Sequence, residues 1–253
     1  MRSIEFSKRT TKEILRDPLS YIFCIGFPVV MLVIMTAVDR SIPKEAQLNI
    51  FKIDYLAPGM AAFGLTFVML FSCLQLSKDR STAFLTRLYA SPMKSADYII
   101  GYTLPSIILA LIQMAVTFTA SFIVAAVIGG ELNIVNVLIS ILCLLPSALM
   151  YIGFGLLFGA LLNDKASPGI CSIVITLSCM IGGIWMDVDS MGGGIKDLSH
   201  VLPFYHGVKA ARVAVNGEMA DIAKPLIITL AYATVIYILA LLVMQGKMKK
   251  DVR

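Results

Sequence analysis

Six apolar stretches that contain no Asp, Glu, Lys, Arg or His constrain the fold of this chain more than any other feature. A bilayer core of about 30 Å requires about 20 helical residues, so each stretch can cross a membrane once. The third and fourth stretches exceed one span but are too short for two spans and a turn, and we expect long, tilted helices there. The predicted spans are 19–38, 55–77, 98–130, 132–163, 166–186 and 225–246.

The composition and the distribution of positive charge place these spans in a multi-pass protein of the cell membrane. Only 15% of the residues are charged, whereas a soluble domain has about a quarter. The segments before the first span, between the second and third, between the fourth and fifth, and after the sixth hold 14 of the 21 Lys and Arg residues. The positive-inside rule therefore predicts that both termini are cytoplasmic. The charged first 18 residues do not resemble a cleavable signal peptide, and the first span is expected to act as an uncleaved insertion signal.

The segment before the first span combines cations with apolar residues. Lys8, Arg9 and Lys12 alternate with Phe6 and Ile14, and a cationic helix with an apolar face tends to lie in the membrane interface. We expect an N-terminal interfacial helix over 1–18 that ends at Asp17-Pro18, because the residue before proline is disfavoured in a helix. The alternative is a basic flank that only sets the orientation of the first span.

The segment 187–224, on the predicted external side, is long and only moderately polar. Apolar residues between Val201 and Val213 suit short helices that dip back into the outer leaflet, and Gly192–Gly194 supply a flexible break before them. Its two histidines, His200 and His206, match no known metal-ligand spacing, so solvated or interfacial histidines are favoured over a metal site.

Missing residue types narrow the mechanism. Secondary transporters usually carry ionisable groups within the membrane, and the six stretches have none. A phosphate-binding G-x-x-x-x-G-K-[ST] loop is absent, as are the usual hydrolase motifs. The sequence therefore favours a non-enzymatic membrane subunit without catalytic residues, cofactor or metal of its own. The five cysteines all fall in predicted spans, and buried free thiols are the simplest interpretation.

A short punctuated segment between the second and third spans is the best candidate for contact with a partner. Phe84, Leu85, Leu88 and Tyr89 form an apolar face, and Ser91-Pro92 ends the helix. Such a helix can dock in a groove of another protein, but a loop that lies among the headgroups and sets topology fits the pattern equally well.

The Gly155–Gly159 pair in the fourth span forms a GxxxG motif, which allows close helix approach. Packing within the chain explains it at least as well as a subunit interface.

Several ordered motifs make the chain similar to the membrane subunits of ABC-2 type transporters, the permeases of bacterial drug, lipid and polysaccharide exporters. "LRDPLSYIFCIGFPVVMLVI" resembles the Arg-Asp-Pro entry of that family into its first span, and "KDRSTAFLTRLYASPMKSADYIIG" resembles its cytoplasmic helix. "PFYHGVKAAR" fits the family signature with Pro203, Phe204, His206 and Arg212.

The resemblance implies a type V ABC exporter-like fold with six spans, a cytoplasmic coupling helix over 79–93 and an external re-entrant segment. It also implies two ATP-binding partner subunits, which bind ATP and Mg, a second six-span permease subunit that is identical or different, and contact with membrane lipid but not nucleic acid. Contacts with the ATPase are expected at Asp79, Arg80, Phe84, Leu85, Arg87, Leu88, Tyr89 and Pro92, and in a second turn at Asn163, Asp164 and Lys165.

By the same resemblance, the pathway would run between two permease copies, lined by the second and fifth spans. Candidate lining residues are Met60, Phe63, Phe67, Met180 and Trp185. The favoured function is energy-dependent export of an amphipathic substrate such as a drug, an antimicrobial peptide or a lipid-like molecule. The alternative is a membrane scaffold or immunity-type binding protein that transports nothing, and an intramembrane enzyme is less favoured than either.

Overall fold

The computed structural model of the chain is an elongated bundle of helices, and it describes residues 2–43, 49–82, 84–85 and 93–251. Every regular element among these residues is a helix. The α-helices are α1 (Arg2–Arg16), α2 (Pro18–Tyr21), α3 (Phe27–Ser41), α4 (Ile53–Ser81), α6 (Ser95–Ile128), α7 (Ile134–Leu161), α8 (Ser167–Ile181), α9 (Gly194–Val201), α10 (Pro203–Asn216) and α11 (Ala223–Asp251).

Five helical stretches are long and apolar enough to cross a membrane, which confirms an all-helical protein of the membrane class but not the predicted count of six. They are Pro18–Ser41, Ile53–Ser81, Ser95–Ile128, Ile134–Leu161 and Met219–Met248. The fifth predicted span, 166–186, contains only the 15-residue helix α8. This helix ends before Gly183, whose φ of 76° belongs to the left-handed region that glycine tolerates.

Prolines shape the first span. Asp17 caps α2 by accepting a hydrogen bond from the backbone N–H of Leu19 (3.2 Å), and Pro18 occupies the first turn. The predicted break at Asp17-Pro18 is therefore confirmed. Pro28 cannot donate to the carbonyl four residues earlier, and the preceding segment Ile22–Gly26 is a π-helix in which the N–H of Phe27 bonds to Ile22 O. The wider turn of the π-helix thus accommodates the hydrogen bond that Pro28 cannot make.

Helix α4 forms the centre of the bundle. In its most apolar stretch 78% of the residues are buried, against 22% for the last span. It packs most extensively on α7, where a Cβ added to Gly155 would lie 2.5 Å from Met69 O and one added to Gly159 would lie 2.8 Å from Cys73 O. The GxxxG motif therefore serves helix packing within this chain.

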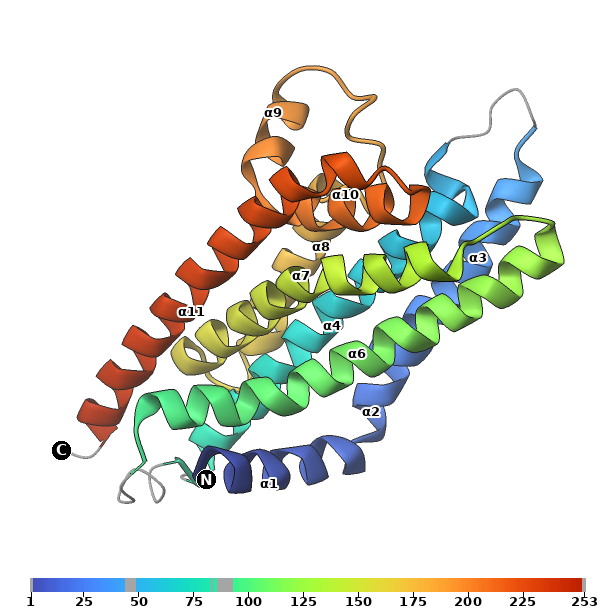
Figure 1. Cartoon of the computed structure of the whole chain (residues 1–253). Helices are drawn as coiled ribbons and strands as arrows, with labels where there is room; N and C mark the ends of the chain where they lie inside the picture. The colour runs from blue at the N-terminus through green and yellow to red at the C-terminus, as the bar shows by residue number, and fades with distance from the viewer. Residues whose placement is uncertain (1, 44–48, 83, 86–92, 252–253) are drawn as a thin grey trace.

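The two ends of the bundle differ in their covering elements (Figure 1). Helix α1 lies across one end, where the N-terminus and the end of α11 are also found, and α9 and α10 cover the opposite end. The segment predicted to be external and re-entrant contains α9 and α10, and Gly193, with a φ of 74°, precedes α9.

Candidate functional sites at the two ends of the bundle

Asp79, a predicted partner contact at the end of α4, is engaged within the chain. It is buried, and it accepts hydrogen bonds from both terminal guanidinium nitrogens of Arg9 (3.3 Å each) and from the hydroxyl of Tyr102 (2.6 Å). A buried carboxylate requires such donors, because burial without them is costly. Asp79 therefore fastens α1 and α6 to the end of α4.

Arg9 connects α1 to the start of the predicted coupling segment. Its guanidinium also bonds to Glu13 (2.5 Å) and lies 3.6 Å from the centre of the Phe84 ring, a cation–π contact. Burial alone would lower the pKa of Arg9. The hydrogen bond and charge of Asp79 and the charge of Glu13 raise the pKa by more than burial lowers it, so that the pKa lies above its ordinary value. Arg9 therefore stays charged and holds Phe84 beside α1.

Arg80 joins α4 to the end of α7. Its Nη1 donates to the carbonyls of Gly159 (3.0 Å), Ala160 and Leu162 (3.2 Å). The last carbonyls of a helix lack partners within that helix and carry partial negative charge. A cation on α4 thus caps α7, and the two helices are linked where their chains leave the bundle.

The two segments predicted to contact an ATPase border one surface depression. It has a volume of about 400 Å³, and Arg80 and Leu85 contribute from one side and Asn163 from the other. Leu85 is buried, whereas Asn163, Asp164 and Lys165 form an exposed turn in which Asn163 Oδ1 accepts from the N–H of Ala166. Four other predicted contacts lie outside the described residues, namely Arg87, Leu88, Tyr89 and Pro92.

The signature residues at the opposite end tie α10 to three other helices. Pro203 begins α10, and the ring of Phe204 stacks on Tyr151 of α7 with 5.9 Å between centroids. The Nε2 of His206 lies 2.8 Å from the carbonyl of His200 in α9. Arg212 Nε donates to the carbonyl of Tyr55 in the first turn of α4 (3.1 Å).

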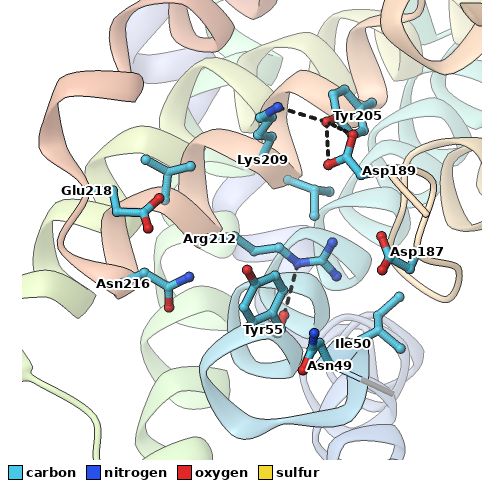
Figure 2. Close-up of a pocket in the computed structure, with 12 residues that line it drawn as sticks. Asn49, Ile50, Tyr55, Asp187, Asp189, Tyr205, Lys209, Arg212, Asn216 and Glu218 are labelled. Carbon is cyan, nitrogen blue, oxygen red and sulfur yellow. Dashed lines mark hydrogen bonds between the residues drawn. The ribbon is translucent and has the colours of Figure 1, made fainter. Parts of the chain in front are cut away.

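Arg212 also lines a polar cavity of about 170 Å³ (Figure 2). Its guanidinium faces the carboxylate of Asp187, and its enclosed Nη2 has no hydrogen-bond partner among the described residues. Burial lowers the pKa of Arg212 to about 10, although the charge of Asp187 opposes the shift. The cavity therefore holds a cation whose hydrogen-bonding capacity is incompletely used.

A second polar group lies beside Arg212 in the same cavity. The Tyr205 hydroxyl contacts both carboxylate oxygens of Asp189 (2.7 and 2.8 Å) and accepts from Lys209 (3.0 Å). Burial raises the pKa of Asp189, but Tyr205, Lys209 and His200 lower it more strongly. Burial lowers the pKa of His206, which favours its neutral form. Among the described residues, no cluster of His, Cys, Asp and Glu could hold a metal ion.

Most residues predicted to line a substrate pathway lie inside this chain. Met60, Phe63 and Phe67 are buried, and Phe63 contacts the rings of Phe67 (5.2 Å) and Trp185 (5.4 Å) edge-to-face. Only Met180, which is 50% exposed, presents much surface. Their role as pathway residues stays a prediction.

Sequence reasoning missed the contacts that dock α1. Phe6 occupies the space above Gly101, where an added Cβ would lie 2.3 Å from its ring, and it packs edge-to-face on Tyr98 and Tyr102. The sequence does not distinguish Arg9 from the other cations of the segment. The helical spacing of Phe6, Arg9 and Glu13 is a signal for one inward face, but it does not identify Asp79 or Tyr102 as their partners.

Comparison with known proteins identifies the family of the chain. The sequence model of the ABC-2 type transporter family matches residues 4–216, which include the signature residues and both ends of the bundle. The chain is also similar to "Putative transport permease YvfS" of Bacillus subtilis (strain 168), with 20% identity over 231 residues that cover 90% of this chain and 91% of the relative. The protein therefore belongs to the ABC-2 type transporter family.

Proposed function

We propose that this chain is the transmembrane permease subunit of an ATP-driven exporter, and that it moves an amphipathic substrate out of the cytoplasm or the inner leaflet. Membership of the ABC-2 type transporter family supports a membrane transport permease. Direction, energy source and substrate class are our proposals. In this arrangement α8 and the following turn make the fifth of six spans, both termini are cytoplasmic, and two ATP-binding subunits act with a second permease subunit.

The depression between the end of α4 and the turn after α7 is the observation that carries the proposal. Residues about 80 positions apart in the sequence, Arg80 and Asn163, border it together. A partner seated there touches α4 and α7 at once, and Arg80 already links these helices through the α7 carbonyls. Movement of the partner on binding ATP would therefore be passed to both central helices.

The segment that begins at Phe84 is proposed to receive this movement. Phe84 packs against Arg9, Leu85 is buried, and the segment follows the end of α4 and precedes α6 in the chain. Pressure on Phe84, Leu85, Arg87 and Leu88 would shift α1, α4 and α6 together. Because Met60, Phe63 and Phe67 are buried, they would reach a pathway between two permease copies only after α4 and its neighbours rearrange.

Capture of the partner tests the proposal. Ser81→Trp fills the rim of the depression, and Ser41→Trp is its matched control: each serine is exposed, ends an apolar helix, and bonds through its hydroxyl to a carbonyl of the preceding turn. The native chain and Ser41→Trp should co-purify from the membrane with a subunit that carries a Walker A motif, and Ser81→Trp should lose it.

Three outcomes would overturn the proposal. Capture of only proteins without a nucleotide-binding motif would favour a scaffold or immunity-type binding protein. Equal capture by both tryptophan variants would remove the depression from the partner interface. A captured ATPase whose activity produces no substrate movement in reconstituted vesicles would reject the export function.

A further inference from the structure

Helix α1 has one face that is exposed in the described part of the chain. On a helical projection, one side carries Ile4, Glu5, Lys8, Lys12, Leu15 and Arg16. Ile4 is 53% exposed and Leu15 is 61% exposed. An exposed face that combines aliphatic residues with three cations suits the boundary between lipid headgroups and acyl chains.

The remaining faces of α1 are already occupied. Phe6 packs on the tyrosines of α6, Ser3 donates to Asp97 (2.8 Å), and Arg9 and Glu13 bond to Asp79 and Gln75 of α4. These contacts fix the rotation of α1 about its axis. The exposed face is therefore held in a defined orientation relative to the bundle.

The charges of this face are unevenly compensated. Lys8 pairs with Glu5 (2.6 Å), and the hydrogen bond and charge of Lys8 hold the pKa of Glu5 below its ordinary value. Within the described part of the chain, Lys12 and Arg16 make no ion pair. Three cations against the one carboxylate of Glu5 leave the face with a net positive charge next to Leu15, which is complementary to a negatively charged membrane surface.

We infer that the exposed face of α1 binds anionic phospholipids of the membrane in which the chain is embedded, with Ile4 and Leu15 among the upper acyl chains and Lys12 and Arg16 on the phosphates. The inference rests on the proposed function only in placing this end of the bundle at a membrane surface. It adds a lipid class and the residues that recognise it.

The position of Arg9 gives this lipid contact a consequence for transport. Arg9 is on the same helix, and it holds Asp79 and the ring of Phe84. Since α1 is fixed to these residues, lipids that seat α1 also fix the start of the segment proposed to receive the partner's movement. Anionic lipid is therefore expected to support the coupling of ATP hydrolysis to transport.

The test uses the purified full-length chain without its partner. The protein is placed in nanodiscs that contain equal amounts of phosphatidylglycerol and phosphatidylcholine, and the lipids that remain bound are counted by native mass spectrometry. A cation near an anionic surface contributes about 1 kcal/mol, so each lost cation should reduce the enrichment of phosphatidylglycerol about fivefold. The double variant Lys12→Gln/Arg16→Gln is compared with Lys165→Gln/Lys247→Gln, which removes the same charge from other segments.

The expected result is loss of phosphatidylglycerol enrichment in the α1 variant and near-native enrichment in the control. Equal enrichment in all three proteins, or an equal loss in both variants, would overturn the inference. If the α1 variant does not fold, a nitroxide on Leu15→Cys decides, since the native cysteines are buried. Its accessibility to oxygen should rise when phosphatidylglycerol replaces phosphatidylcholine, and an unchanged accessibility would reject the inference. Neither readout involves an ATPase, so failure here is distinct from failure of the proposed function.

Discussion

The close approach of α4 and α7 makes a quantitative prediction for Gly155→Ala. The new Cβ would lie 2.5 Å from Met69 O and 3.2 Å from Cys73 N, both backbone atoms that cannot rotate away. Overpacking of a tight interface costs about 1–3 kcal/mol, and the better helix propensity of alanine returns up to about 1 kcal/mol. We therefore expect a net destabilisation of about 1–2 kcal/mol.

Gly246→Ala on α11 is the matched control, because nothing lies within 4 Å of an added Cβ there. It should leave stability unchanged or raise it by up to about 1 kcal/mol. Thermal unfolding of the detergent-purified proteins at one scan rate should place the Tm of Gly155→Ala about 2–8 °C below that of the native chain. If Gly155→Ala and Gly246→Ala unfold at the same temperature, the packing argument is wrong. A change in subunit association without a change in Tm would instead assign the GxxxG motif to a subunit interface.

Three further predictions concern the two ends of the bundle. Asp79→Asn should destabilise the chain by about 1–3 kcal/mol, because it weakens the hydrogen bonds from Arg9 and Tyr102. A double-mutant cycle with Arg9→Met should show coupling between the two residues, and additive Tm changes would refute the link between them. Arg212→Met should change Tm little. Removal of the buried charge is worth about 3 kcal/mol from the pKa of about 10, and it offsets the loss of the hydrogen bond to Tyr55 O, which costs about 1.5–3 kcal/mol. Transport in vesicles should nevertheless fall at least tenfold. Because the pKa of His206 is lowered on folding, the unfolded state takes up the proton first, so stability should fall as the pH drops below about 6.5. His206→Gln should weaken this dependence between pH 7 and 5, and a pH profile altered by His200→Gln alone would contradict the assignment.

The spans were predictable because the membrane leaves few ways to bury an apolar run. Each of the six stretches is largely helical, and the break at Asp17-Pro18 follows from local backbone chemistry. The count of six exceeded the five long apolar helices of the structure, since charge alone cannot show that Gly183 stops α8 well inside the stretch 166–186. Hydropathy measures how apolar a stretch is, whereas backbone conformation decides where its helix ends.

The surroundings of the candidate sites could be predicted only in part. The sequence placed Arg80, Leu85 and Asn163 at one end of the bundle, and the structure adds that they border one depression. Nothing in the sequence indicates that Asp79 bonds to Arg9 and Tyr102, because tertiary packing alone brings together partners that are 70 and 23 residues away. Likewise, the signature containing Arg212 marked its importance without revealing Tyr55 or Asp187 as its neighbours.

The shortness of α8 has a consequence for how this part of the chain can cross the membrane. Its 15 residues are about 22 Å long, against a hydrocarbon thickness of about 30 Å. The turn after the helix can supply the remaining distance of about 8 Å, because its Gly182, Gly183 and Ile184 are buried, and non-helical backbone is tolerated at membrane depth where protein covers it. Helix α10 provides part of this cover, since a Cβ added to Gly182 would lie 3.1 Å from Phe204. A change in α10 that uncovered this turn would expose non-helical backbone to lipid, which is costly.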